Sequence, residues 1–291
     1  MTSRCSGGRE LVQGTSVTVI IPNYNYAKYV AEAIDSVLSQ SYKNCELIVV
    51  NNGSTDDSLD ILREYGDRIR VIDQPNLGQS GARNSGLRHA RGDFIAFLDA
   101  DDSWEKNKIE KQISLLTEST QLIYCGIRPF RSSSSDITPI ELPKYKGDCT
   151  NYFLEYPGAS IVLSGESTAL FSRSLLERVG EFDPKLNSTA GWDFFRRCSK
   201  LTKFGFINES LVNYRLHDNN MSNSSVEVIL DMRRAYIKLF SDKNWEIPQA
   251  MQTKVEKSLE LSYLKTYLKA ANLRLALNST INLIRLLAKF S

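Results

Sequence analysis

The sequence of 291 residues lacks the features that mark several classes of protein. Its five cysteines are widely spaced and form no CxxC pair, which argues against a zinc ribbon and against a disulfide framework. No uninterrupted apolar run reaches the roughly 18 residues that suggest a membrane-spanning helix. Residues 1–14 are polar and show no signal peptide. We therefore expect a cytoplasmic protein in a reducing compartment.

An excess of charge of either sign is also missing. The chain has 36 Lys and Arg against 34 Asp and Glu, a net charge of +2, which gives no reason to expect nucleic acid as a partner. With 42% apolar and 24% charged residues the composition is that of a globular protein, which excludes a disordered chain and a collagen. The length allows one large domain or two small ones.

The first hundred residues alternate between short β-branched runs and segments with helical spacing. Four runs predict buried strands, at residues 17–21, 46–50, 69–73 and 94–98. Helical patterns follow these runs, at about residues 30–38, 57–65, 80–90 and 106–117. This alternation predicts an α/β fold in which helices flank a mostly parallel sheet, and residues 165–171 predict a further strand. From residue 226 onward the pattern is helical throughout.

In such a sheet, ligands bind at the carboxyl ends of the strands. The fourth strand runs directly into Asp99-Ala100-Asp101-Asp102. Because clustered carboxylates repel one another, a divalent cation would stabilise them. Mg²⁺ and Mn²⁺ prefer oxygen ligands and leave positions for substrate phosphates. The alternative is a solvated helix cap rich in aspartate.

Two other polar segments are weaker signals. Residues 51–57 follow the second strand, where a polar side chain commonly meets the ribose or base of a nucleotide. A turn with a helix N-cap would explain them equally well. Residues 76–86 contain three glycines, and Arg83 among them could reach a phosphate. They have neither the spacing nor the position of a dinucleotide-binding loop.

Four segments together resemble the motifs of the family 2 glycosyltransferases. They are VTVIIPNYN (residues 17–25), NNGSTD (51–56), GARNSG (81–86) and FLDADD (97–102). They stand in the family's order and at its usual intervals, and the resemblance covers about residues 16–222. It implies a GT-A fold, a nucleotide-sugar donor, a divalent metal ion (Mn²⁺ or Mg²⁺) and inversion at the anomeric carbon.

The resemblance also implies a division of the chain. We expect a flexible tail at residues 1–15, a GT-A domain with a Rossmann-like sheet at residues 16–222, and a C-terminal helical region at residues 223–291.

On the donor side, the resemblance gives roles to individual residues. It places Pro22, Asn23 and Tyr24 beside the nucleotide base. Asn52 stands where the family usually has an aspartate that reads uracil, and an amide oxygen can still accept a hydrogen bond there. Arg83 would touch the nucleotide.

The resemblance likewise implies a metal site. Asp99 would face the ribose or the metal, while Asp101 and Asp102 would face the metal and the diphosphate. Residues 214–222 are similar to the family segment that closes the donor site. By that similarity His217 would ligate the metal or contact the diphosphate.

The catalytic base is the least clear of the expected groups. Similar proteins often carry an acidic pair just before the tryptophan, and its aspartate is usually taken as the base. Here Ala190 and Gly191 precede Trp192. Asp193 is the nearest carboxylate, and we expect it to take the proton of the acceptor hydroxyl. The alternative is that Asp193 only caps the helix or pairs with Arg196 or Arg197.

The expected function is transfer of a sugar from a UDP-sugar to a glycan or lipid-linked acceptor, in surface polysaccharide assembly. The rival hypothesis is a binding protein that holds a nucleotide sugar, or a partner enzyme, without turning it over. The rival is favoured by Asn51-Asn52 and Ala190-Gly191, which stand where similar proteins carry acidic residues. The intact Asp99-Ala100-Asp101-Asp102 favours the enzyme.

The last helical segment has an apolar and a basic face. Its apolar face consists of Leu273, Leu277, Ile281, Ile284 and Leu287. A basic amphipathic helix can lie on an anionic membrane, so peripheral contact with the cytoplasmic face of the inner membrane is one prediction. The alternative is that this face packs on the catalytic domain or on a second subunit in a homodimer.

Overall fold

The computed structural model describes residues 14–131, 138–155, 161–162, 165–217, 225–269 and 271–288. Apart from residues 14 and 15, the tail expected at residues 1–15 lies outside the described residues. So do residues 218–222 of the segment expected to close the donor site.

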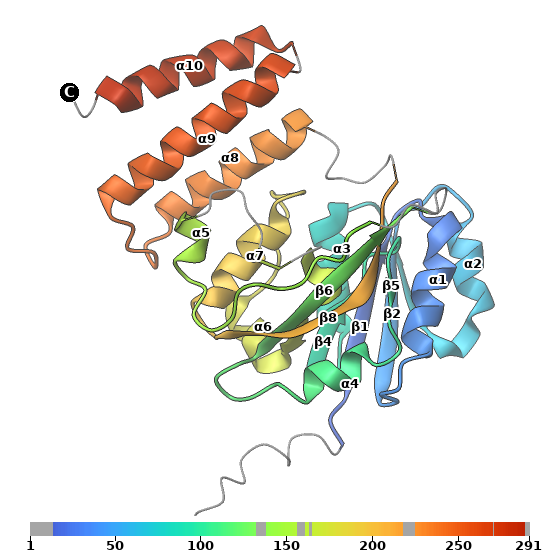
Figure 1. Ribbon diagram of the computed structural model, residues 1–291. Coiled ribbons are helices and arrows are strands. Elements are labelled where there is room, and N and C mark those ends of the chain that lie inside the picture. Colours follow the sequence, from blue (N-terminus) through green and yellow to red (C-terminus); the bar gives the residue numbers. More distant parts are fainter. Residues whose placement is uncertain are drawn as a thin grey trace, which may run out of the picture.

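An eight-stranded sheet forms the centre of the protein (Figure 1), in the order β3-β2-β1-β4-β7-β6-β8-β5. The strands are β1 (Val17–Asn23), β2 (Cys45–Asn52), β3 (Arg70–Gln74), β4 (Phe94–Phe97), β5 (Ser103–Trp104), β6 (Leu122–Phe130), β7 (Leu170–Ser172) and β8 (Phe204–Arg215). β1 pairs in parallel with β2 and β4, and β2 pairs in parallel with β3. The four strands predicted from the first hundred residues are therefore confirmed, and so is the α/β fold.

The other half of the sheet is mixed. β7 runs antiparallel to β4 and β6, whereas β6 and β8 are parallel with an irregular register around Gly126. The sequence patterns did not predict β6. The strand expected at residues 165–171 is also wrong in part. Gly165 has a φ of +56°, which an extended strand does not allow, and a 3₁₀ helix, η2 (Gly165–Thr168), precedes the short β7.

Helices cover both faces of the sheet because successive side chains of a strand point to opposite sides. Val19 and Ile21 of β1 pack in one core with helices α1, α2 and α4, whereas Ile20 packs in another with α3, α6 and α7. The bounds of the helices in this part are α1 (Ala27–Leu38), α2 (Ser58–Glu64), η1 (Gly66–Arg68), α3 (Gly78–His89), α4 (Lys108–Ile113), α5 (Tyr152–Glu155), α6 (Arg173–Val179) and α7 (Ala190–Ser199).

Three stacked helices form the C-terminal region (Figure 1): α8 (Ser225–Ser241), α9 (Gln249–Lys269) and α10 (Leu273–Ala288). The core on the α3 side of the sheet continues into them through Tyr236 and Tyr263. The rings of Trp192 on α7 and Tyr236 on α8 lie 4.6 Å apart. The helical extension is confirmed, while the division of the chain near residue 223 stays a prediction.

Helix α10 packs on α9 through small residues, since Ala276 and Ser279 are buried. Small side chains let the two backbones approach closely. Two leucines of its apolar face do not take part in this packing, since Leu273 is 74% exposed and Leu277 is 61% exposed. Packing of this face on the catalytic domain is therefore wrong for Leu273 and Leu277. None of the helices in the described ranges is long and apolar enough to cross a membrane.

Candidate active site

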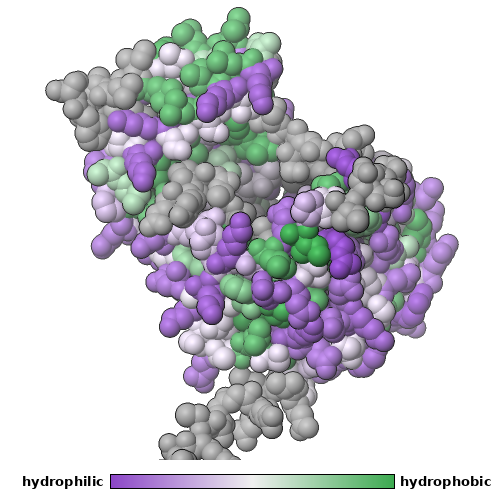
Figure 2. Space-filling model, viewed as in Figure 1, coloured by the Kyte–Doolittle hydropathy of each residue, from purple (hydrophilic) through white to green (hydrophobic). Residues whose placement is uncertain are grey.

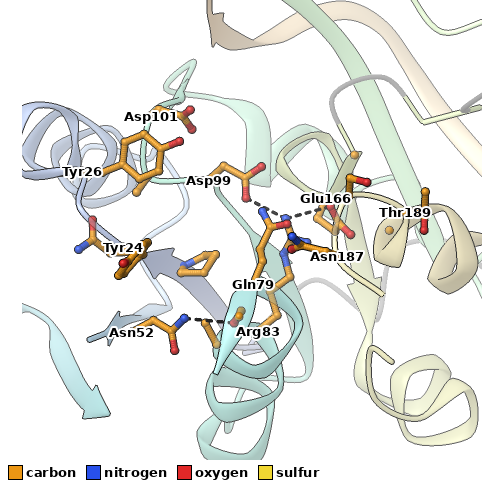
Figure 3. A pocket seen from close by; sticks show the side chains of 18 of the residues that line it. Tyr24, Tyr26, Asn52, Gln79, Arg83, Asp99, Asp101, Glu166, Asn187 and Thr189 are labelled. Carbon is orange, nitrogen blue, oxygen red and sulfur yellow. Dashed lines mark hydrogen bonds and ion pairs between the residues drawn. The ribbon is translucent and has the colours of Figure 1, made fainter. Parts of the chain in front are cut away.

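A cavity of about 910 Å³ lies at the carboxyl ends of β1, β2 and β4. The strand order reverses at β1, which has β2 on one side and β4 on the other. Ligands of α/β proteins bind at such a reversal, and the volume suits an organic ligand. The predicted site residues that line the cavity are Pro22, Asn23, Tyr24, Asn52, Arg83, Asp99 and Asp101. Figure 3 shows how several of them gather around it.

The loops after β1 and β2 are tied together at one end of the cavity. Asn23 donates from Nδ2 to the Ser54 hydroxyl over 3.2 Å, and Asn25 accepts from the Thr55 amide over 2.7 Å. Asn25 holds this contact with a left-handed φ of 58°. The Asn23 Oδ1 atom is buried without a hydrogen-bond partner among the described residues. Because a buried acceptor is costly when unpaired, Asn23 is suited to bind a donor group of a ligand.

The side-chain amide of Asn52 lines the cavity, but all of its hydrogen-bonding capacity is taken up by other protein groups. Its Oδ1 accepts from Gln74 Nε2 over 2.7 Å and from the Leu77 amide over 3.0 Å. Its Nδ2 donates to Asn76 Oδ1 and to the Gly78 carbonyl, each over 3.1 Å. An asparagine side chain can make four hydrogen bonds, and all four are made here. In this arrangement Asn52 holds the loop before α3, and the structure does not support it as a reader of uracil.

Arg83 lies in the cavity wall between two carboxylates (Figure 3). Its Nη2 atom is 2.9 Å from Asp99 Oδ1 and 3.1 Å from Glu166 Oε2. Burial lowers the pKa of Arg83, but Glu166 and Asp99 raise it above its usual value. Glu166 was not among the predicted site residues, because residues 165–171 were interpreted as a strand. The signal that points to it is Gly191, which stands where similar proteins often carry an acidic side chain.

The two last carboxylates of the acidic cluster after β4, Asp101 and Asp102, lie in different surroundings. Asp101 lines the cavity, and its Oδ2 lies 2.9 Å from Nε2 of His217. The His217 ring stacks on Tyr29 with the ring centres 5.4 Å apart. Asp102 points elsewhere: it is buried away from the cavity, and its Oδ1 accepts from the Arg215 amide over 3.1 Å.

The carboxylates of the cluster repel one another as predicted. Burial and the neighbouring Asp99 raise the pKa of Asp101, and burial together with Asp101 and Asp99 raises the pKa of Asp102 well above its usual range. A cation bound at Asp101 would lower the free energy of this cluster.

The described residues hold no group of three or more His, Cys, Asp or Glu side chains placed to bind a metal. They do place His217 beside Asp101, which lines the cavity. Mg²⁺ and Mn²⁺ are often held by one or two protein ligands and completed by substrate phosphates. Asp101 and His217 fit such a site. Asp102 does not fit it, because its carboxylate is buried against the backbone of Arg215.

Asp193 lies outside the cavity, and its carboxylate is fully buried. Oδ1 is 2.8 Å from Arg196, and Oδ2 is 3.0 Å from Arg197 and 2.9 Å from Lys238 on α8. Burial raises the pKa of Asp193, but Arg197 and Arg196 outweigh it and the pKa lies below its usual value. A carboxylate held by three cations and out of reach of the cavity is poorly placed to take a proton. The structure contradicts Asp193 as the base and supports the alternative, pairing with Arg196 and Arg197.

The far end of the cavity is built by segments around α7 and α8. Residues 187–189, Gly191 and Trp192 form one side, and Val228 and Met232 of α8 form another. The Asp231 carboxylate on α8 accepts from the Asn187 and Thr189 amides, each over 2.9 Å. Helix α8 therefore fixes the segment before α7, and the cavity has one polar end and one end walled partly by apolar side chains.

The family model for "Glycosyl transferase family 2" matches residues 18–180. The putative teichuronic acid biosynthesis glycosyltransferase TuaG of Bacillus subtilis is 34% identical over 217 residues, which are 72% of this chain and 82% of TuaG. An uncharacterised glycosyltransferase of Rickettsia typhi is 33% identical over 214 residues, covering 72% of this chain and 67% of that protein.

Solved structures show the same fold at low sequence identity. Staphylococcus aureus TarS in complex with UDP-GlcNAc has a TM-score of 0.67 and 18% identity, over 94% of this chain and 80% of that chain. The mannosyltransferase PcManGT of Pyrobaculum calidifontis, in complex with GDP-Man and Mn²⁺, has a TM-score of 0.60 and 21% identity, over 95% of this chain and 76% of that chain. The fold is therefore GT-A, the enzyme prediction is confirmed, and the chain belongs to glycosyltransferase family 2.

Proposed function

We propose that this glycosyltransferase moves a sugar, with inversion, from a UDP-sugar to a saccharide or lipid-linked acceptor in surface polysaccharide assembly. The observation that carries the proposal is that one continuous cavity joins a polar end at β1 and β2 to the acidic edge at Asp99 and Asp101 and to the wall of α7 and α8. The putative role of TuaG in teichuronic acid biosynthesis supports the acceptor class, and the UDP-GlcNAc complex of TarS supports the donor class.

In this proposal the polar end binds the nucleotide. Pro22, Asn23 and Tyr24 would lie against the base, while Arg83 and Asp99 would face the ribose or the phosphates. Asp101 and His217 would hold Mn²⁺ or Mg²⁺, which neutralises the charge of the leaving diphosphate when bound. The complex of PcManGT with GDP-Man and Mn²⁺ supports a metal. The acceptor would enter at the α7 and α8 end, opposite the diphosphate, as inversion requires.

The test is a panel of nucleotide sugars. UDP-glucose, UDP-galactose, UDP-GlcNAc and GDP-mannose are added with and without MnCl₂, and both the melting temperature and the release of free nucleotide are measured. A donor at 100 times its Kd should add about 2.7 kcal/mol of stability. We expect a UDP-sugar to stabilise the protein only with Mn²⁺. Stabilisation by GDP-mannose alone would overturn the UDP assignment, and none by any member would overturn the function.

The exposed face of α10 supports peripheral contact with the inner membrane at its cytoplasmic side. The apolar stripe of Leu273 and Leu277 is flanked by exposed Lys269, Arg274 and Arg285. Figure 2 shows apolar residues gathered over the C-terminal helices. Apolar side chains among cations are suited to an anionic lipid surface. A homodimer through the same face is the alternative outcome.

The double variant Leu273→Asp with Leu277→Asp separates these outcomes. Because both side chains are exposed, the free energy of unfolding should stay within about 0.5 kcal/mol of wild type. Binding to phosphatidylglycerol vesicles in a flotation assay should weaken at least tenfold, since burying a leucine contributes roughly 1.5–3 kcal/mol. Leu115→Asp, at an exposed leucine just after α4, is the control and should change neither measurement. A changed sedimentation coefficient without a change in flotation would favour the homodimer, and no change in either would contradict both.

A further inference from the structure

The absence of a side chain at Gly191 makes room for Glu166. A Cβ atom built on Gly191 would lie 2.5 Å from Oε1 of Glu166, closer than real Cβ atoms come to another heavy atom. Gly191 and Ala190 stand at the two positions before Trp192 where similar proteins often carry an acidic pair. Here an acidic group reaches the same place from η2, a different element of the fold.

The two carboxylate oxygens of Glu166 differ in their surroundings. The side chain is 5% exposed, and its Oε2 forms the ion pair with Arg83. Oε1 is buried and has no hydrogen-bond partner among the described residues. A buried acceptor that stays unpaired costs free energy, so such an atom points to a ligand that supplies the missing donor. Glu166 lines the cavity, between Arg83 and Thr189 in Figure 3.

The position of Glu166 separates it from the other carboxylates of the cavity. Among the described residues that line it, the carboxylates are Asp99, Asp101 and Glu166. Asp99 pairs with Arg83 at the donor side, and Asp101 lies against His217. Glu166 alone of these three touches Gly191, at the end walled by α7 and α8.

We propose that Glu166 is the catalytic base of this chain, an inference that rests on the proposed function. The acceptor hydroxyl donates to Oε1 and attacks the anomeric carbon of the donor sugar. A bond forms between that oxygen and the anomeric carbon as the bond from this carbon to the diphosphate oxygen breaks. The hydroxyl proton passes to Oε1, and the bonding electron pair leaves with the nucleoside diphosphate. Arg83 holds Oε2, which leaves Oε1, beside Gly191, as the oxygen that can accept the proton.

The charges around Glu166 agree with this role. Burial raises the pKa of its carboxyl, Arg83 lowers it and Asp99 raises it, and the result lies above the usual value. A carboxylate with a raised pKa accepts a proton more readily near neutral pH.

Glu166→Gln is the variant that tests the base. It keeps the size of the side chain and its contact with Arg83 but cannot take a proton. Turnover of the best UDP-sugar of the panel, measured with Mn²⁺ as transfer or as hydrolysis by water, should fall by about 10²–10⁴-fold. The Kd for UDP with Mn²⁺ should stay within twofold of wild type. Glu166→Asp should restore part of the turnover. Glu181→Gln is the matched control, because Glu181 also pairs with an arginine but lies exposed on the surface.

Each outcome decides between the two proposals. Wild-type turnover in Glu166→Gln with intact UDP binding would overturn the base and leave the function standing. A loss of UDP binding that accounts for the lost turnover would make Glu166 a positioning residue for Arg83 and would also overturn the base. If the wild type turns over no nucleotide sugar, the proposed function itself fails.

A second variant tests the proposal if Glu166→Gln does not fold. Gly191→Ala should displace Oε1 and lower turnover while the Kd for UDP with Mn²⁺ is kept. Unchanged turnover in a folded Gly191→Ala protein would contradict the assignment.

Discussion

Asp193→Ala should destabilise the protein by about 3–5 kcal/mol, the usual loss when one partner of a buried ion pair is removed. Arg196 is fully buried beside Asp193 and would keep one carboxylate partner among the described residues, Asp242 at 3.2 Å. Lys238 would lose its contact with α7 as well. Equilibrium unfolding in urea measures the loss as a lower midpoint.

Asp183→Asn is the control for this experiment. Asp183 also pairs with Lys238, at 2.7 Å, but it is partly exposed, so its loss should cost about 1 kcal/mol or less. If Asp193→Ala unfolds at the wild-type midpoint and yet loses turnover, the ion network is not its main role and the base hypothesis for Asp193 returns.

Asp101→Asn should weaken UDP binding in the presence of Mn²⁺ by at least about a hundredfold. Changes in the outer shell of a metal site already cost 10–100-fold, and Asp101 is proposed to contact the ion directly. Without metal the variant should be at least as stable as wild type, because one of the mutually repelling carboxylates is neutralised. Calorimetric titration of UDP at fixed MnCl₂ and a melting curve in EDTA measure the two effects.

Asp102→Asn is the matched variant in the same cluster. Its Oδ1 can still accept from the Arg215 amide, so UDP binding with Mn²⁺ should stay close to that of wild type. Loss of binding in Asp102→Asn but not in Asp101→Asn would mean that the two residues have been assigned in the wrong order.

The N-terminal half of the fold could be predicted because each strand and helix there is indicated by the pattern of its own residues. Strands such as β1 and β2 are β-branched runs. Asn23 ends β1, Arg83 lies in α3 and Asp101 follows β4, so the order of these elements fixes where the three motif residues meet. That is why the motifs placed these residues on one cavity.

The residues whose roles were not predicted from the sequence depend on partners in other segments of the chain. Asp193 is held by Lys238, and Asn52 is held by the loop that leads into α3. Glu166 meets Gly191 only after η2 and α7 are packed together. The sequence pattern of one segment does not indicate such pairs. Glu166 lies in the 3₁₀ helix η2, which the sequence pattern predicted to be part of a strand.

The cavity is lined partly by residues that the family model matches and partly by residues of α7 and α8, which lie outside the match. The donor end, from Pro22 to Asp101, lies inside residues 18–180, the part of the chain that the family model matches. Trp192, Val228 and Met232 lie beyond it. If the acceptor enters at the α7 and α8 end, as proposed, a change of acceptor would require changes mainly in these two helices, while the donor end could stay as it is.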